Sequence, residues 1–185
     1  MDVWTDLEQS LLQTLRLPHN AIALRGQGKT PEQAAAAKVA EVKSGLGNVA
    51  RAETFTGPRL LLRVVGPANR AYSGEWWFDA SLLDTLEKAY SRLYFHSADR
   101  KAVLRDMLRE LLAVTTEWNA MTEVWALELS AGESLKAVVG KGARQKLFGG
   151  LPLTDRANRM LVGQAEQIFV VVKNPLWVRK YTQLA

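Results

Sequence analysis

The sequence predicts an α+β fold, and three observations support this prediction. Apolar residues at helical spacing dominate the first third of the chain and recur at 82–93 and 100–116. Short apolar runs, rich in β-branched residues, predict strands at 60–65, 122–129, 135–139 and 163–175. The resulting order is helices, a strand, two helices, a hairpin, a loop and a last strand, which is typical of an α+β protein.

Length and composition predict one well-cored domain with a basic surface. The chain has 185 residues and a formal net charge of +5, which favours acidic partners such as nucleotides, nucleic acid or an acidic protein. There is no cysteine, so disulfides, thiolate zinc sites and cysteine nucleophiles are excluded. The two histidines, His19 and His96, are far apart in the sequence, so we expect no metal site.

The N-terminus and the hydropathy pattern predict action in an aqueous compartment. The first residues are acidic and lack a signal-peptide layout, and no apolar run approaches the length of a membrane span. We therefore expect the protein in the cytoplasm of a producing or target cell, without membrane association. If it is exported, we expect a secretion route that needs no cleaved leader.

The first third of the chain predicts a helical segment, 1–57, in front of an α+β domain, 58–185. Apolar residues at helical spacing predict a helix at 2–17, which Pro18 closes. Thr30 and Pro31 predict the start of a second helix at 32–43. This start places Lys29 outside the helix, so the triplet Gly28-Lys29-Thr30 favours a basic turn over a phosphate-binding loop. Glycines and weak periodicity at 45–58 predict a loop or linker.

The strand predicted at 60–65 contains a charged residue, Arg63. An arginine is almost never fully buried without a partner. Arg63 therefore either faces solvent from an edge strand or binds an anion such as a carboxylate or phosphate. Glycine and proline at 66–67 end this strand.

A polar and aromatic loop is predicted to follow, and it contributes Tyr72, Ser73, Trp76, Trp77 and Phe78. Rings and hydroxyls beside a guanidinium suit an aromatic, phosphorylated ligand. The alternative is that these rings only fill the core.

The remaining elements follow from periodicity and turn residues. Asp79 or Ser81 caps the helix through 82–93, and a break at 96–99 precedes the amphipathic helix at 100–116. A turn at 130–133 between the strands 122–129 and 135–139 predicts a hairpin. The segments 141–150 and 152–160 are glycine-rich or polar and predict loops. A basic and aromatic tail, 177–181, follows the last strand.

Glu166, after Gln164, is a second polar residue near an apolar strand. An arginine can clamp a diphosphate, and a carboxylate can stabilise the positive charge that develops on a ribose when its glycosidic bond breaks. The pair Arg63 and Glu166 therefore predicts chemistry on NAD.

This layout resembles the ADP-ribosyltransferase-like domains of bacterial toxins. The resemblance rests on Arg63 within Leu-Leu-Leu-Arg-Val-Val, on Gln164-Ala165-Glu166 at the mouth of a late strand, and on short motifs shared with C-terminal toxin domains of Rhs-type and other polymorphic secreted effectors. It covers roughly the last two thirds of the chain. The family's Ser-Thr-Ser strand has no counterpart here.

The resemblance implies a split, mixed or antiparallel sheet with helices, and NAD as the cofactor. It implies that Arg63 binds the cofactor's phosphates, that Glu166 is catalytic and that Gln164 orients the target side chain. Tyr72, Ser73, Trp76 and Trp77 would complete the cofactor site. The expected activity is ADP-ribosyl transfer to a protein or nucleic-acid target, or NAD hydrolysis, by a secreted toxin or effector that an acidic immunity protein inhibits.

Two alternatives belong to other classes of protein. One is a non-catalytic basic module that binds nucleic acid or protein through the loop at 141–146 and through Arg179 and Lys180. The other is a metal-independent nuclease toxin with lysine and glutamate as acid and base.

Overall fold

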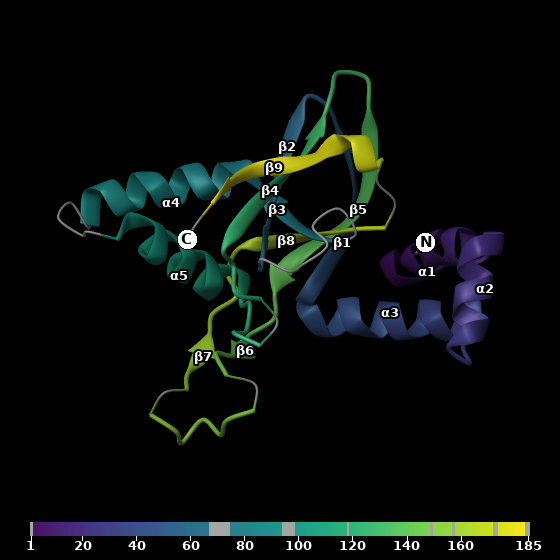
Figure 1. Ribbon diagram of the computed structural model, residues 1–185, viewed down its shortest axis with the longest axis horizontal. Coiled ribbons are helices and arrows are strands. Elements are labelled where there is room, and N and C mark those ends of the chain that lie inside the picture. The colour runs from purple at the N-terminus through teal and green to yellow at the C-terminus, as the bar shows by residue number, and fades with distance from the viewer. Residues whose placement is uncertain are drawn as a thin grey trace.

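The computed structural model of the chain describes residues 2–66, 75–93, 99–117, 119–148, 150–156, 158–171 and 174–183. An antiparallel sheet lies at the centre of the molecule (Figure 1). On one side lie three helices from the N-terminal part, α1 (Val3–Leu15), α2 (Pro18–Gly26) and α3 (Pro31–Gly45). On the other side lie α4 (Ala80–Leu93) and α5 (Arg100–Leu112). The predicted α+β class is confirmed.

The main sheet has seven strands in the order β1-β5-β8-β3-β2-β4-β9, and each neighbouring pair is antiparallel. Its strands are β1 (Leu46–Thr56), β2 (Arg59–Val65), β3 (Trp76–Asp79), β4 (Glu123–Leu129), β5 (Ser134–Gly142), β8 (Glu166–Val170) and β9 (Val178–Gln183). Two residue pairs, Leu61 with Asp79 and Leu62 with Phe78, join β2 to β3. This short seam divides the sheet into two halves, β1-β5-β8-β3 and β2-β4-β9.

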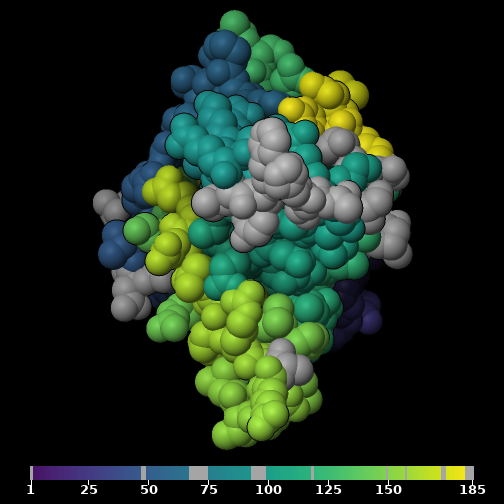
Figure 2. Space-filling model, turned by 90° about the vertical axis from the view of Figure 1, so that its left-hand side faces the viewer, coloured from purple at the N-terminus to yellow at the C-terminus, as the bar shows by residue number. Residues whose placement is uncertain are grey.

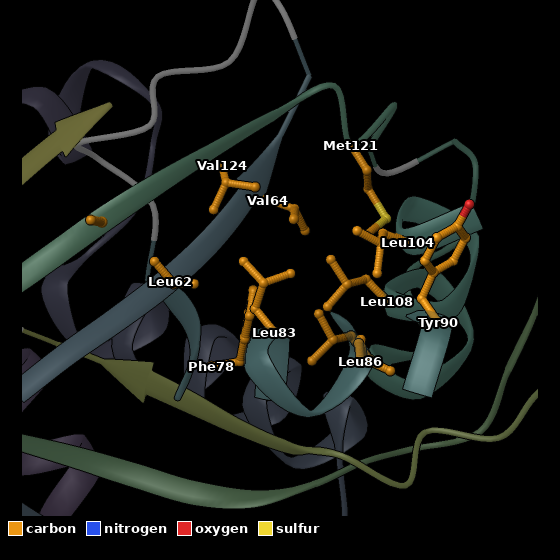
Figure 3. Close-up of a cluster of buried hydrophobic side chains, with 12 residues drawn as sticks. Leu62, Val64, Phe78, Leu83, Leu86, Tyr90, Leu104, Leu108, Met121 and Val124 are labelled. Carbon is orange, nitrogen blue, oxygen red and sulfur yellow. The ribbon is translucent and has the colours of Figure 1, made fainter. Parts of the chain in front are cut away.

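The helices α4 and α5 cover the half that contains β2 and β4. Their apolar faces contribute leucines such as Leu86 and Leu108 to a buried cluster with Leu62 and Val64 of β2 (Figure 3). Since side chains alternate along a strand, Arg63 faces away from this cluster. The apolar residues whose helical spacing predicted α4 and α5 therefore form the faces that pack on the sheet.

Two further clusters complete the core. One joins the two halves of the sheet, with Leu61 and Leu127 from one half and Val139 and Ile168 from the other. The last cluster packs Leu11 of α1 and Val42 of α3 against Val138 of β5 and Phe169 of β8. The N-terminal helices are thus packed on the sheet, whereas the boundary at 57/58 stays a prediction.

Local signals explain where two of the helices begin and end. The hydroxyl of Thr30 accepts from the Gln33 backbone N–H while the Gln33 side chain accepts from the Thr30 N–H, which confirms the predicted cap of α3. The Asp99 carboxylate accepts from the Ala102 N–H at the start of α5. Ala113, with φ of 49°, ends α5 in the left-handed conformation.

Several sequence-based expectations were wrong. The supposed loop or linker at 45–58 contains β1, which pairs with β5 from Ala50 to Thr56. The aromatic segment contains a strand, β3, and the basic tail contains β9 after a short 3₁₀ helix, η2 (Pro175–Trp177). The strands β4 and β5 form no hairpin, because β4 pairs with β2 and β9 whereas β5 pairs with β1 and β8.

A small second sheet lies outside the main one. It consists of β6 (Gln145–Lys146) and β7 (Met160–Leu161), in segments that were expected to be loops. The chain between these strands projects from the body of the molecule below α5 (Figures 1 and 2). Within the described residues, no helix has the length and hydropathy needed to cross a bilayer.

Candidate functional site

A cavity of about 460 Å³ lies where the central strands meet the C-terminal ends of α3 and α5. Its volume falls in the range of small-molecule sites. Its walls come from stretches far apart in the sequence: Glu41, Ser44, Gly45, Arg63, Val64, Trp76, Trp77, Phe78, Leu112, Ala113, Val114, Asn119, Ala143, Gln145 and Gln167. Val64 and Phe78 also belong to the cluster under α4 and α5 (Figure 3). The cavity is therefore mainly apolar, with a few polar groups around it.

Arg63 brings a positive charge to this apolar cavity. Its Nη1 is buried and has no hydrogen-bond partner among the described residues. Burial lowers the pKa of the guanidinium, and the negative charge of Glu75 opposes this shift. A buried guanidinium nitrogen without an acceptor costs free energy that a bound anion can recover. Arg63 is thus suited to bind an anionic group inside the cavity.

Trp76 forms an aromatic wall of the cavity. Its ring meets the ring of Phe169 edge-on, with 5.2 Å between the centroids and 72° between the planes. The indole also lies against Gly45, where an added Cβ would lie 2.9 Å from it. The absence of a side chain at position 45 therefore allows the end of α3 to approach the indole closely.

Gln167 brings a polar side chain from β8. Its Nε2 donates to the backbone oxygen of Leu112 at the end of α5. The amide lies against Gly142, because an added Cβ at that glycine would lie 2.5 Å from Nε2 of Gln167. The orientation of Gln167 is thus set by backbone groups of α5 and β5.

The loop after α5 is tied to the strand that carries Arg63. Asn119 donates from Nδ2 to the Val64 oxygen at 2.7 Å and accepts from the Met121 N–H at 2.8 Å. The buried Arg109 donates from Nη1 to the Val114 oxygen and from Nη2 to the Asn119 oxygen, both at 2.9 Å. Arg109 therefore holds the loop, and Asn119 anchors the loop to β2.

A small ionic group lies at the α3 side of the cavity. Lys38 contacts the carboxylate of Glu41 at 2.7 Å and that of Glu75 at 3.0 Å. Burial acts to lower the pKa of Lys38, but the hydrogen bond to Glu41 and the attraction of Glu75 outweigh it, so this pKa lies above its usual value. Since Lys38 is on α3 and Glu75 precedes β3, the group connects the N-terminal helices to the central strands.

The cavity brings together four of the residues that the sequence analysis singled out. They are Arg63, Trp76, Trp77 and Phe78. Tyr72 and Ser73 lie outside the described residues. Gln164 and Glu166 are exposed, and neither is among the residues that line the cavity.

Glu166 lies on the surface beside basic residues. Its carboxylate accepts from both terminal nitrogens of Arg51, at 2.7 and 3.3 Å. The hydrogen bond with Arg51 lowers the pKa of Glu166, and the charges of Lys141 and Arg59 act in the same direction. The side chain is 52% exposed. A catalytic role for Glu166 stays a prediction, but the cavity residue of β8 is its neighbour Gln167.

Sequence reasoning missed Glu41, Gly45, Asn119 and Gln167. Glu41 and Gly45 belong to a segment that was expected to be an appendage and a linker. Asn119 stands in a loop between two well-predicted elements, and its role depends on long-range contacts. A signal for Gln167 did exist, because a glutamine at the start of a buried strand is as unusual as a glutamate there.

Comparisons with known proteins give little further guidance. No family model matches the sequence, and no curated protein matches it significantly. Among solved structures, the chain is similar to a chain in the structure of Tse6 in complex with Tsi6. That match covers 98% of each chain at 12% identity with a TM-score of 0.37. A score at this level supports no argument about fold or function.

Proposed function

We propose that the cavity binds NAD and that the protein cleaves the bond between nicotinamide and ribose. The observation that carries this proposal is the buried Nη1 of Arg63, which has no hydrogen-bond partner among the described residues, on a side chain that lines an apolar cavity together with Trp76. An anion site next to an aromatic wall suits a ligand with a diphosphate and flat rings.

The arrangement of strands supports the same proposal. The sequence resembles ADP-ribosyltransferase-like domains, for which a split sheet and an arginine on the first core strand are expected. Here the arginine strand β2 borders the seam between the two halves, and the late strand β8 is separated from it only by β3. The strand that carries the predicted phosphate clamp therefore lies close to the strand that would carry the second polar residue.

The proposed reaction is hydrolysis of the N-glycosidic bond. The bond from the ribose C1′ to the ring nitrogen breaks, its electron pair stays on nicotinamide, and water adds to C1′ and releases a proton. Arg63 binds the diphosphate, and Trp76 stacks on a flat ring of the ligand. Gln167, held by Leu112, offers its amide oxygen to a ribose hydroxyl, which holds the sugar while positive charge develops on it.

The basic binding module is less well supported. Arg179 pairs with Glu128 and Lys180 pairs with Glu123 across β4 and β9. Lys146 donates to the Leu151 backbone oxygen. Three of the five charges expected to bind nucleic acid are thus engaged within the chain.

The test is the release of nicotinamide from NAD by the purified chain. We expect release by the wild type and a loss of at least about a hundredfold for Arg63→Ala, because a charge-assisted contact to the diphosphate is worth about 3 kcal/mol. Arg16→Ala is the matched control, since it removes an exposed arginine paired with Glu32. We expect it to leave the rate unchanged.

Two further variants distinguish the residues of β8. We expect Gln167→Ala to lower the rate and Glu166→Gln to leave most of it. The opposite result would favour the catalytic role first predicted for Glu166. No nicotinamide release, together with no thermal stabilisation of the wild type by NAD, would contradict the proposed function.

The resemblance to polymorphic toxin domains suggests the biological setting. We propose that the protein is a toxin or effector that depletes NAD in a target cell. A producing cell then needs an inhibitor, and an acidic immunity protein would match the net charge of +5.

A further inference from the structure

We propose that the α3 side of the cavity is its cation-binding end, and that Glu41 there selects the positively charged nicotinamide ring of NAD over the neutral ring of its reduced form. This inference rests on the proposed function and adds to it a specificity-determining residue. It assigns a role to the N-terminal helices that the sequence presented as an appendage.

The two charged side chains that line the cavity come from different elements. Among the described lining residues, Arg63 is the cationic side chain and Glu41 the acidic one. Arg63 comes from β2 and Glu41 from α3. Lys38 is shared between the carboxylates of Glu41 and Glu75, so these three side chains together carry one net negative charge. The cavity therefore has a positive wall at β2 and a negative wall at α3.

The end of α3 strengthens the negative side. Ser44 and Gly45 of the last turn of α3 line the cavity. The C-terminal end of a helix carries roughly half a negative charge, and it favours cations within its last turn. The α3 side of the cavity is therefore unsuited to a second anion but suited to a cation.

A ligand with both kinds of charge fits this polarity. NAD carries an anionic diphosphate and a cationic pyridinium ring, whereas the ring of the reduced form is neutral. With the diphosphate at Arg63, the ring extends towards α3 and stacks on Trp76, whose indole touches Gly45. A cationic ring also gains from the electron-rich face of an indole. The oxidised form should therefore bind more tightly than the reduced form.

The experiment uses two probes that resist cleavage and differ only in the ring. These are the carbocyclic analogue of NAD, in which a cyclopentane replaces the nicotinamide ribose, and its 1,4-dihydro form. Their dissociation constants are measured by calorimetry with the full chain. We expect the wild type to prefer the oxidised probe and Glu41→Gln to reduce this preference about threefold, as for one partly exposed ion pair.

Two other variants make the test specific. Glu32→Gln makes the same charge change on an exposed face of α3 and should leave the preference as it is in the wild type. Lys38→Met removes the ammonium between Glu41 and Glu75 and should increase the preference. Thermal unfolding of each variant checks that it is folded.

The possible outcomes separate this inference from the proposed function. If neither probe binds the wild type, both are wrong. If both probes bind the wild type equally, or if Glu41→Gln keeps the full preference, the cation-binding end is wrong although the dinucleotide site stands. A change in Glu32→Gln as large as that in Glu41→Gln would also overturn the inference, because it would show a general effect of net charge.

Discussion

Single residues of the candidate site differ in how well the sequence could predict them. Arg63 was predictable because a charge within an apolar strand requires a partner or solvent, whatever the tertiary structure. The sequence could not predict which residue of β8 would reach the cavity. Successive side chains of a strand point to opposite faces, so an error of one residue in the phase exchanges Glu166 for Gln167. Only the neighbouring strands decide that phase.

Asp79 gives a prediction about pH and stability. Its carboxylate contacts Arg59 at 2.7 Å and accepts from the Ser81 N–H at the start of α4. Burial acts to raise the pKa of Asp79, but the hydrogen bonds from Ser81 and the charge of Arg59 outweigh it and hold the pKa below 3.8. A carboxyl with a lowered pKa in the folded state stabilises the protein above its unfolded-state pKa, and this stability is lost as the pH falls through the folded-state pKa.

We therefore expect Asp79→Asn to lower the free energy of unfolding by about 1 kcal/mol at neutral pH, after allowance for solvent screening. As the pH falls through the folded-state pKa of Asp79, the variant and the wild type should converge, because the wild-type carboxyl then becomes protonated as well. Urea unfolding at neutral pH and at the lowest pH at which both proteins stay folded measures this. An equal difference at both values would show that Asp79 does not act through its charge.

At the scale of elements, the sequence predicted helices better than strands. The faces of α4 and α5 follow from spacing within one segment, and the start of α3 follows from Thr30 and Pro31. The strand β1 was missed because it is rich in polar residues, and its pairing with β5 depends on residues 78 or more positions away. The prediction of a hairpin between β4 and β5 was wrong because each of these strands pairs with distant segments, in different halves of the sheet.

Arg109 shows how one element positions another. It reaches from α5 to the backbone oxygens of Val114 and Asn119, and Asn119 in turn holds Val64 next to Arg63. Arg109→Met keeps much of the side-chain volume but leaves both oxygens without these donors. We expect a loss of about 2 kcal/mol in the free energy of unfolding.

The activity of Arg109→Met tests its positioning role. We expect a raised KM for NAD with a smaller change in kcat, because the displaced strand carries Arg63, the proposed phosphate clamp. Arg105→Met is the control, since Arg105 is on the same helix and pairs with its neighbour Asp106. If Arg109→Met loses stability but keeps the wild-type KM, the residue is structural only.

For the whole molecule, composition and element order predicted the α+β class but not the order of strands in the sheet. That order depends on pairings between distant segments, which one sequence does not reveal. The packing of Leu11 and Val42 against Val138 and Phe169 likewise joins segments that are far apart in the sequence. It makes the first third of the chain part of the structure around the candidate site, where the sequence indicated only a helical extension.

The short seam between β2 and β3 has a consequence for dynamics. Two residue pairs join the halves there, whereas β1 and β5 are aligned over many more, so the seam should open more often than the pairing of β1 with β5. Amide hydrogens of residues 61, 62, 78 and 79 should exchange with deuterium faster than those of β1. Because the cavity is lined by β2, β3 and β8, an occupant would bridge the seam and slow this exchange. Equal exchange at the seam and in β1 would contradict this expectation.

A bound dinucleotide would act as a cross-link between the two halves of the sheet, and the protein without it would be the looser form.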